Sequence, residues 1–191
     1  HACDYEMAFR THQTLMRLAF SRYETSGRTG LDDFIAADPT GILDFALFLS
    51  IRSRYAGLSW HLWPDEDLRN HDPAALDRFM IEHQQEIRFH LFGQYEFFRQ
   101  WDALRAEINS LGIQIVGDLP IYVGYDSCDV WADRHQFELD SNGLPIEVAG
   151  VPPDYFTEDG QLWGNPLYDW AAMERDGFSW WVRRIQECFR L

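Results

Sequence analysis

The stretch "LGIQIVGDLPIYV", residues 111–123, decides the fold class because the hydrophobic period changes inside it. Residues 113–123 are β-branched and apolar without polar alternation before Asp118, which predicts a strand buried on both faces. Gly112 precedes this strand and is the expected end of a long helix. The helix is predicted from apolar residues at steps of three and four, namely Ile87, Leu91, Tyr95, Phe98, Trp101, Leu104, Ile108 and Leu111. A helix, a glycine and a buried strand indicate half of an α/β unit.

Asp118 is a candidate functional residue because of its place at the end of this strand. Pro120 cannot continue a central ladder, so the strand is expected to end around residues 117–120. In (β/α) barrels the carboxyl ends of the strands carry the active site. A carboxylate at a strand end can equally cap a helix or complete a loop, and both interpretations stay open on these grounds.

Residues 1–111 are expected to form a mostly helical region, and residues 112–191 a strand with a long loop and further helices. Helical spacing covers residues 4–23, 31–37 and 41–55, with Thr40 as a cap of the third helix. Asp72 followed by Pro73 is typical of a helix start. Farther along, Asp169 and Ser179 are expected to cap two short helices.

Two polar stretches follow the predicted strand. "FELDSNGLPIEV", residues 137–148, is predicted as a β-hairpin around the turn pair Asn142-Gly143. "DYFTEDGQLWGNP", residues 154–166, shows neither helical period nor strand alternation and is predicted as an aromatic loop. Its rings either fold back as core plugs, as we weigh for Tyr155 and Trp163, or remain exposed for a partner with an apolar face and many hydroxyls.

Bulk composition limits the possible partners. The formal charge of −15 argues against nucleic acid and anionic membranes, and neither a membrane-spanning stretch nor a signal peptide is visible. Cys3, Cys128 and Cys188 are odd in number and far apart, which favours reduced thiols in a cytoplasm. No Cys/His spacing predicts a metal site. Aromatic residues make up 16% of the chain and suit either a core or a sugar-binding cleft.

From residue 117 onward the sequence resembles the 4-alpha-glucanotransferases of the amylomaltase, or disproportionating-enzyme, type. The resemblance rests on "GDLPIYV" (117–123), "DSCDVWA" (126–132), "VAGVPPDYF" (148–156) and "GQLWGNPLYDW" (160–170). It extends more loosely over the earlier helices. Cys128 and Tyr125 depart from the residues expected there.

The resemblance implies an α/β fold: part of a (β/α)8 TIM barrel with a helical insertion and a β-hairpin excursion. It implies cytoplasmic transfer of alpha-1,4-glucan segments by a retaining double displacement, without metal or organic cofactor. It also implies a nucleophilic aspartate and an acid/base glutamate beyond Leu191, so no catalytic residue is assigned to this chain, which is expected to be inactive alone.

Seven residues are expected to contact alpha-1,4-glucans: Asp118, Asp154, Tyr155, Phe156, Gln161, Trp163 and Asn165. The residues between Asp154 and Asn165 would form a lid over the acceptor, which excludes water. For Tyr122 and Trp131, structural packing is the favoured role. Unpaired strand edges allow self-association. Two other interpretations remain: a non-catalytic alpha-glucan-binding module, and a hydrolase of the alpha-amylase clan.

Overall fold

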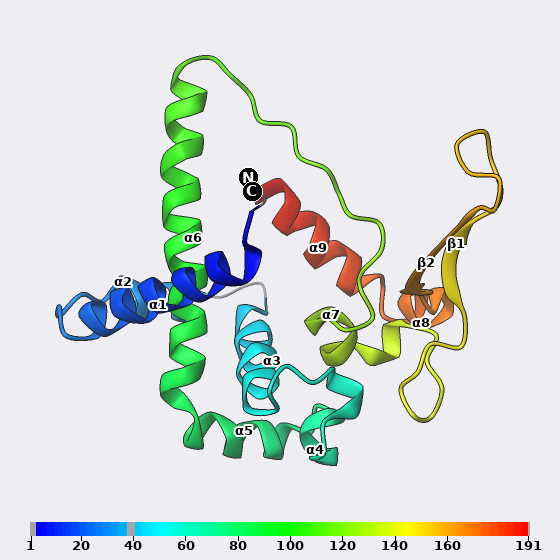
Figure 1. Cartoon of the computed structure of the whole chain (residues 1–191), viewed down its shortest axis with the longest axis horizontal. Helices are drawn as coiled ribbons and strands as arrows, with labels where there is room; N and C mark the ends of the chain where they lie inside the picture. Colours follow the sequence, from blue (N-terminus) through cyan, green and yellow to red (C-terminus); the bar gives the residue numbers. More distant parts are fainter. Residues whose placement is uncertain (1–2, 38–40, 191) are drawn as a thin grey trace. The chain divides into compact units, whose positions relative to one another are not determined.

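The computed structural model describes residues 3–37 and 41–190, and within these ranges the chain is mostly helical with one two-stranded sheet (Figure 1). It divides into two compact units, which are residues 1–46 with 80–115 and residues 47–79 with 116–191. This division differs from a boundary at residue 111, because residues 47–79 fold with the C-terminal part of the chain. Of the helices in the described ranges, none combines the length and the apolar character needed to cross a membrane.

The first unit contains α1 (Tyr5–Glu24), α2 (Gly30–Ala36), the start of α3 (Ile42–Arg54), the end of α5 (Pro73–Glu82) and α6 (Gln84–Ser110). The second contains the rest of α3 and α5 and a series of short elements. These are η1 (Trp60–Leu62), α4 (Glu66–Arg69), α7 (Cys128–Ala132), η2 (Arg134–Gln136), β1 (Val148–Val151), β2 (Gln161–Pro166), α8 (Trp170–Arg175) and α9 (Ser179–Arg190).

Several helix ends lie where the local sequence predicts them. Asp4 caps α1 by accepting a hydrogen bond from the Met7 N–H, and Asp72 accepts one from the Ala75 N–H at the start of α5. Gly112, with a φ of +77°, follows α6 as expected. The proposed cap Thr40 lies outside the described residues. Ser179 differs from expectation because it is the first residue of α9, where its N–H and hydroxyl donate to Asp176.

The first unit is held by aromatic packing of α1 and α2 on the N-terminal half of α6. Phe20 contacts the rings of Phe89 and Phe92, at centroid distances of 5.7 and 5.5 Å. Tyr95 lies so close to α2 that a Cβ on Gly30 would meet its hydroxyl at 2.5 Å. The predicted apolar face of α6 is therefore buried over its first turns, whereas Leu104 and Leu111 near its end are exposed.

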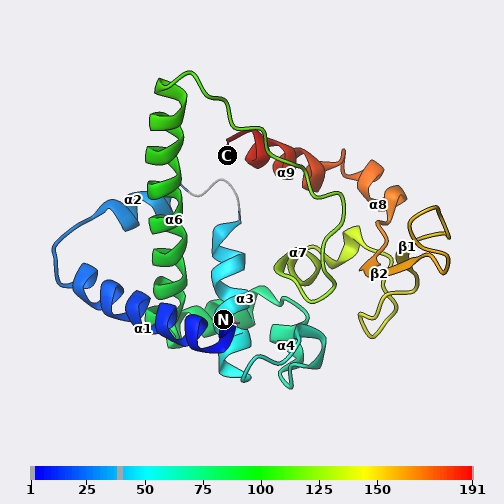
Figure 2. The same cartoon turned by 45° about the horizontal axis from the view of Figure 1, so that its top comes forward.

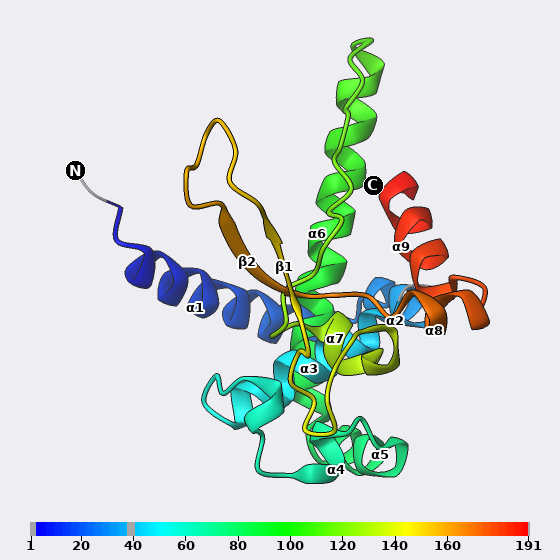
Figure 3. The same cartoon turned by 90° about the vertical axis from the view of Figure 1, so that its right-hand side faces the viewer.

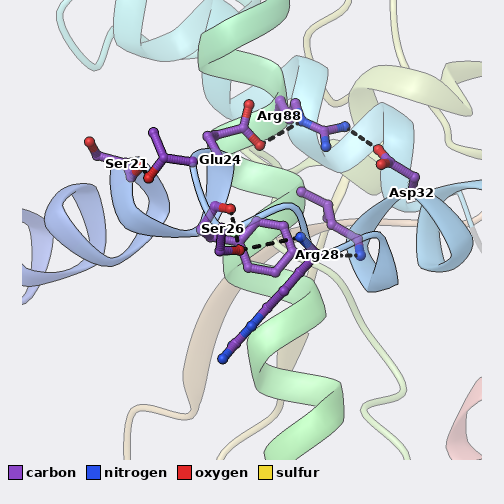
Figure 4. Close-up of polar contacts among 9 residues, drawn as sticks. Ser21, Glu24, Ser26, Arg28, Asp32 and Arg88 are labelled. Atoms are coloured by element: carbon purple, nitrogen blue, oxygen red, sulfur yellow. Dashed lines mark hydrogen bonds and ion pairs between the residues drawn. The ribbon is translucent and has the colours of Figure 1, made fainter.

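Ion pairs join the same three helices at the surface of this unit. The Arg88 guanidinium donates to Glu24 of α1 at 2.9 Å and to Asp32 of α2 at 2.6 Å (Figure 4). Two residues earlier on α6, Glu86 accepts two hydrogen bonds from Arg17, at 2.7 and 2.6 Å. The hydrogen bonds from Arg17 have the largest effect on the pKa of Glu86 and lower it, whereas partial burial acts in the opposite direction. Arg17 and Arg88 thus fix the register of α1 and α2 on α6.

The core of the second unit is built on three tryptophans that are shielded from solvent, Trp60, Trp63 and Trp131. Each indole N–H donates to a backbone carbonyl: Trp60 to Tyr125, Trp63 to Leu58 and Trp131 to Leu68, at 2.8–2.9 Å. A buried indole needs such a partner, because an unpaired donor in the core is destabilising. Much of the aromatic content therefore serves this core, and the packing role favoured for Trp131 is confirmed.

The predicted buried strand over residues 113–123 is wrong for this structure. The segment runs as a coil between α6 and α7 (Figure 2), and Val116 is 91% exposed. A strand forms only when neighbouring backbones pair with its N–H and C=O groups. In the described part of the chain no strand lies alongside these residues, so their apolar pattern has nothing to pack into.

The sheet of the second unit lies later in the chain than expected. β1 and β2 pair antiparallel, with Gly150 opposite Leu162 and a bulge between Val148 and Gly150. Residues 161–166 are therefore a strand, although the stretch 154–166 was predicted as a loop because it lacks both helical period and strand alternation. The turn at Asn142-Gly143 is present, with Gly143 at a φ of +79°, but its arms form only the isolated bridge between Leu139 and Pro145. Val148, the last residue of the second arm, instead begins β1, which pairs with residues 161–166.

Candidate functional site

The predicted site residues all belong to the second unit, where two segments carry them. The first is the coil at residues 118–123, and the second is the hairpin formed by β1, β2 and the loop between them. In Figure 3 this hairpin is a long ribbon whose loop extends beyond the paired strands, away from α8.

Asp118 lies in the coil with an exposed side chain. The residues after it are fixed from outside, since the carbonyl oxygen of Pro120 accepts from the Arg184 guanidinium at 3.3 Å. The Ile121 carbonyl accepts from the Tyr168 hydroxyl at 3.1 Å. Asp118 therefore precedes an anchored segment, although the strand that was expected to present it is not formed.

The tip of the hairpin is organised by Asp154. Its Oδ1 accepts hydrogen bonds from the N–H groups of Phe156 and Thr157, both at 2.9 Å. These backbone donors, Thr157 first and Phe156 second, lower the pKa of Asp154, so its carboxylate stays ionised. One oxygen thus shapes the loop as an Asx turn. Among the hydrogen bonds of the described residues none involves Oδ2, which leaves it available to a ligand.

Tyr155 and Phe156 are not core plugs. Their side chains are 98% and 87% exposed, and they contact each other edge to face at a centroid distance of 5.7 Å. Asp154 holds the backbone beneath them, so the two rings are displayed from a defined turn. The two neighbouring rings form an exposed apolar surface at the tip of the loop.

At the base of the loop, Gln161 and Trp163 act as a pair on β2. The indole N–H of Trp163 donates to Gln161 Oε1 at 3.0 Å, which leaves the Gln161 amide N–H groups free to donate elsewhere. The Trp163 ring is 47% exposed and meets the edge of Tyr122 at 6.0 Å. It therefore combines a fixed orientation with an accessible face.

Asn165 is bound to the coil through its side chain. Its Nδ2 donates to the Val123 carbonyl at 2.7 Å, in a partly buried position. The bond joins β2 to the coil five residues after Asp118. Among the predicted site residues it is the clearest direct link between the two segments.

Sequence reasoning missed Tyr168 and Arg184, which fix the coil from the residues after β2 and from α9. Tyr168 lies within the block "GQLWGNPLYDW" but gave no sign of its target, because a backbone carbonyl leaves no trace in the sequence. Burial raises the pKa of its hydroxyl to about 12, so it remains a donor at neutral pH. Arg184 lies on α9, and the sequence predicted this helix only from the spacing of its apolar residues.

A cavity of about 670 Å³ lies elsewhere in the second unit and is lined by none of the seven predicted residues. Its walls include two arginines, a histidine and three aspartates, which are Arg134, Arg175, His135, Asp140, Asp169 and Asp176. All three aspartates are engaged locally: Asp169 caps α8, Asp176 accepts from Ser179, and Asp140 accepts from the N–H groups of Asn142 and Leu144. The His, Cys, Asp and Glu side chains of the described residues form no group that would hold a metal ion.

The chain matches known proteins over its whole length. The sequence profile of the 4-alpha-glucanotransferase family matches residues 1–191. The chain is 40% identical over 189 residues to the 4-alpha-glucanotransferase of Streptococcus pneumoniae serotype 4, covering 98% of this chain and 37% of that protein. It is 52% identical over 143 residues to the chloroplastic/amyloplastic 4-alpha-glucanotransferase of Solanum tuberosum, covering 75% of this chain and 25% of that protein.

A solved structure gives the same result in three dimensions. The amylomaltase from Streptococcus agalactiae, in complex with acarbose, superposes with a TM-score of 0.90 at 35% sequence identity. The superposition covers 96% of this chain and 37% of that one. The chain thus spans between 25% and 37% of the length of these three proteins.

Proposed function

The chain belongs to the 4-alpha-glucanotransferase family, and from this premise we propose that it forms the lid and one cleft wall of an enzyme that transfers alpha-1,4-glucan segments. The proposal includes a (β/α)8 barrel in which residues 113–123 become a strand once neighbouring strands are present. The likeness to the amylomaltase, at a TM-score of 0.90, supports this fold.

The observation that carries the proposal is the display of Tyr155 and Phe156 on the Asp154 turn. Two rings at 98% and 87% exposure are unfavourable in water and need a partner. A pyranose offers C–H faces to such rings and hydroxyls to nearby polar groups. Asp154 Oδ2 and the free amide of Gln161 provide those polar groups at the tip and the base of the same hairpin.

We assign direct glucan contacts to Asp118, Asp154, Tyr155, Phe156, Gln161 and Trp163. For Asn165 we propose an anchoring role, since its amide is already bonded to Val123. Asp118 would bind hydroxyls of the donor sugar or brace neighbouring groups. The exposed face of Trp163 would stack on a glucose ring near the base of the lid.

The chemistry we propose is a retaining double displacement. One carboxylate attacks the anomeric carbon while a second protonates the leaving oxygen, and the two stand about 5–5.5 Å apart. We assign neither to this chain, in line with the expectation that both lie beyond Leu191. The role of the hairpin is to exclude water from the covalent glycosyl intermediate, so that a sugar hydroxyl resolves it. Transfer then prevails over hydrolysis.

Maltoheptaose titration followed by tryptophan fluorescence tests the binding part of this proposal. We expect saturable binding that is weakened when Tyr155 and Phe156 are both replaced by Ser, while Leu62→Ser, at another exposed apolar residue, leaves it unchanged. Equal affinity of the Tyr155/Phe156 variant and the parent chain would contradict the lid assignment. Incubation with maltotriose tests the assignment of both catalytic carboxylates outside this chain. We expect glucan binding without turnover, and the appearance of longer maltooligosaccharides would contradict that assignment.

The compartment and the oligomeric state belong to the same proposal. We keep a cytoplasmic location on the grounds that Cys3, Cys128 and Cys188 form no disulfide bond with one another, noting that the relative from Solanum tuberosum is named as chloroplastic/amyloplastic. We also keep self-association through the uncovered apolar coil, because Val116 and Ile121 are exposed there.

A further inference from the structure

The coil after Asp118 is bound through its carbonyl oxygens by side chains. In a barrel strand these oxygens would accept from the N–H groups of a neighbouring backbone. Here the carbonyls of residues 120, 121 and 123 accept instead from Arg184, Tyr168 and Asn165, at 3.3, 3.1 and 2.7 Å. Side-chain donors thus satisfy the carbonyl oxygens that backbone N–H groups of a neighbouring strand would satisfy in a sheet.

The three donors come from two different parts of the second unit. Asn165 lies on β2 and Tyr168 lies two residues after its end, so two of the bonds tie the coil to the base of the hairpin formed by β1, β2 and the loop between them, here called the aromatic hairpin. Arg184 belongs to α9, where its guanidinium also lies 3.5 Å from Asp129 Oδ1 and 5.1 Å from the Trp180 ring centroid. A cation held by a carboxylate and a ring has little freedom to leave its carbonyl.

Ring packing reinforces the same connection. Tyr122, within the coil, lies between Trp163 and Tyr168, at centroid distances of 6.0 Å from each. The Tyr122 and Tyr168 rings are stacked with an interplanar angle of 7°. The side chain at residue 122 therefore packs on the hairpin root while the carbonyls on either side of it are hydrogen bonded. Displacement of β2 must displace the coil as well.

We infer that Asn165, Tyr168 and Arg184 are positioning residues that hold the Asp118 end of the coil against the root of the aromatic hairpin. The inference deepens the proposed function and rests on it, since Asp118 and the hairpin are there assigned to one glucan site. The three side chains act through the backbone and do not touch the glucan. Pro120 adds stiffness between Asp118 and the first bonded carbonyl because its φ is fixed.

Tyr168→Phe and Asn165→Asp remove one donor each with little change in volume. The matched control is Tyr125→Phe, because the Tyr125 hydroxyl also donates to a backbone carbonyl, that of Gly143, at 2.6 Å. Burial raises the pKa of Tyr125 to about 12, as it does for Tyr168. The control therefore loses the same kind of hydrogen bond in the same unit, but that bond goes to the turn at Gly143 and not to a carbonyl of residues 120–123.

Two measurements are made on each variant. The first is the NMR order parameter of the backbone amides of Asp118, Leu119 and Ile121–Val123, expected to fall from about 0.85 to below about 0.6 in Tyr168→Phe and Asn165→Asp only. The second is maltoheptaose affinity, expected to weaken about three- to tenfold in the same two variants and to remain unchanged in Tyr125→Phe.

The two readouts separate failure of this inference from failure of the proposed function. Order parameters that are the same in Tyr168→Phe, Asn165→Asp and Tyr125→Phe would overturn the inference, whatever the affinities. A parent chain that binds no maltoheptaose would overturn the proposed function, while the order parameters still decide whether the coil is held by these residues. Loosening of the coil with unchanged affinity would show that the anchoring does not serve the glucan site, and would refute the inference in that form.

Discussion

Replacing Gly160 by Ala is expected to open the aromatic hairpin. Gly160 closes the loop in front of β2 with a φ of +72°, and a Cβ there would lie 2.5 Å from the Val151 carbonyl oxygen. Backbone atoms of Pro152 and Pro153 would lie 3.1 Å away. Each of these neighbours is main chain, so no side-chain rotation relieves the overlap.

The magnitude follows from two separate terms. A left-handed backbone disfavours Ala by about 1 kcal/mol relative to Gly, and the overlap adds about 2 kcal/mol. Gly164→Ala isolates the first term, because Gly164 has a φ of +77° with no atom within 4 Å of the added Cβ. Gly117→Ala carries neither term, since its surroundings are open and its φ lies outside the left-handed region.

Hydrogen exchange at the ladder amides of β1 and β2 measures the free energy of hairpin opening directly. We expect exchange about fivefold faster in Gly164→Ala and more than about a hundredfold faster in Gly160→Ala, since 1.4 kcal/mol corresponds to a factor of ten. Gly117→Ala should leave these amides unchanged. Equal acceleration in Gly160→Ala and Gly164→Ala would refute the steric argument, because the two share only the backbone term.

Three further perturbations test other parts of the structure. Arg88→Met should lower the free energy of unfolding by about 1 kcal/mol at low salt and less at 1 M NaCl, because it removes partly exposed bonds to Glu24 and Asp32; a salt-independent loss in urea titrations would contradict an ionic origin. The free energy of unfolding should decrease in two stages as the pH is lowered. The first stage comes from His90, whose pKa is lowered from 6.5 by burial, and the second from Glu86, whose pKa is lowered from 4.5 by the Arg17 hydrogen bonds. In both cases the unfolded chain binds the proton first as pH drops, so Arg17→Met should remove most of the loss below about pH 4.5, and an unchanged pH profile would count against it. Val116→Lys should shift any self-associated fraction to monomer in light scattering at matched concentration, and an unaltered mass distribution would exclude the coil as the contact.

Features whose cause is local were predictable from the sequence. Asp4 and Asp72 cap their helices because a carboxylate three residues before a free N–H is sufficient, and Gly112 and Gly143 take the positive φ that their turns require. The aromatic residues Tyr155 and Phe156 were correctly placed on a polar loop. Each of these depends on a few consecutive residues.

Features that need a distant partner were not predictable. The apolar coil at residues 113–123 has the composition of a strand, but strand formation depends on neighbours that are not in its own sequence. Conversely, residues 161–166 contain a glycine and a proline and show no strand alternation, yet they form β2 because Val148–Val151 lies beside them. The donors Tyr168 and Arg184 were missed for the same reason, since their partners are backbone carbonyls 47 and 64 residues away.

Gly164, whose backbone has a positive φ, divides β2 into an exposed part and a more buried part. The four residues before and including it are exposed, whereas Asn165 and Pro166 turn inward. The loop between Val151 and Gln161 lies on the exposed side of this glycine. Asn165 and Tyr168, which follow the glycine, attach the hairpin to the coil. A different loop grafted between Val151 and Gln161 would therefore keep the same attachment to the coil, so the sequence of the tip can change without loss of the hydrogen bonds at its base.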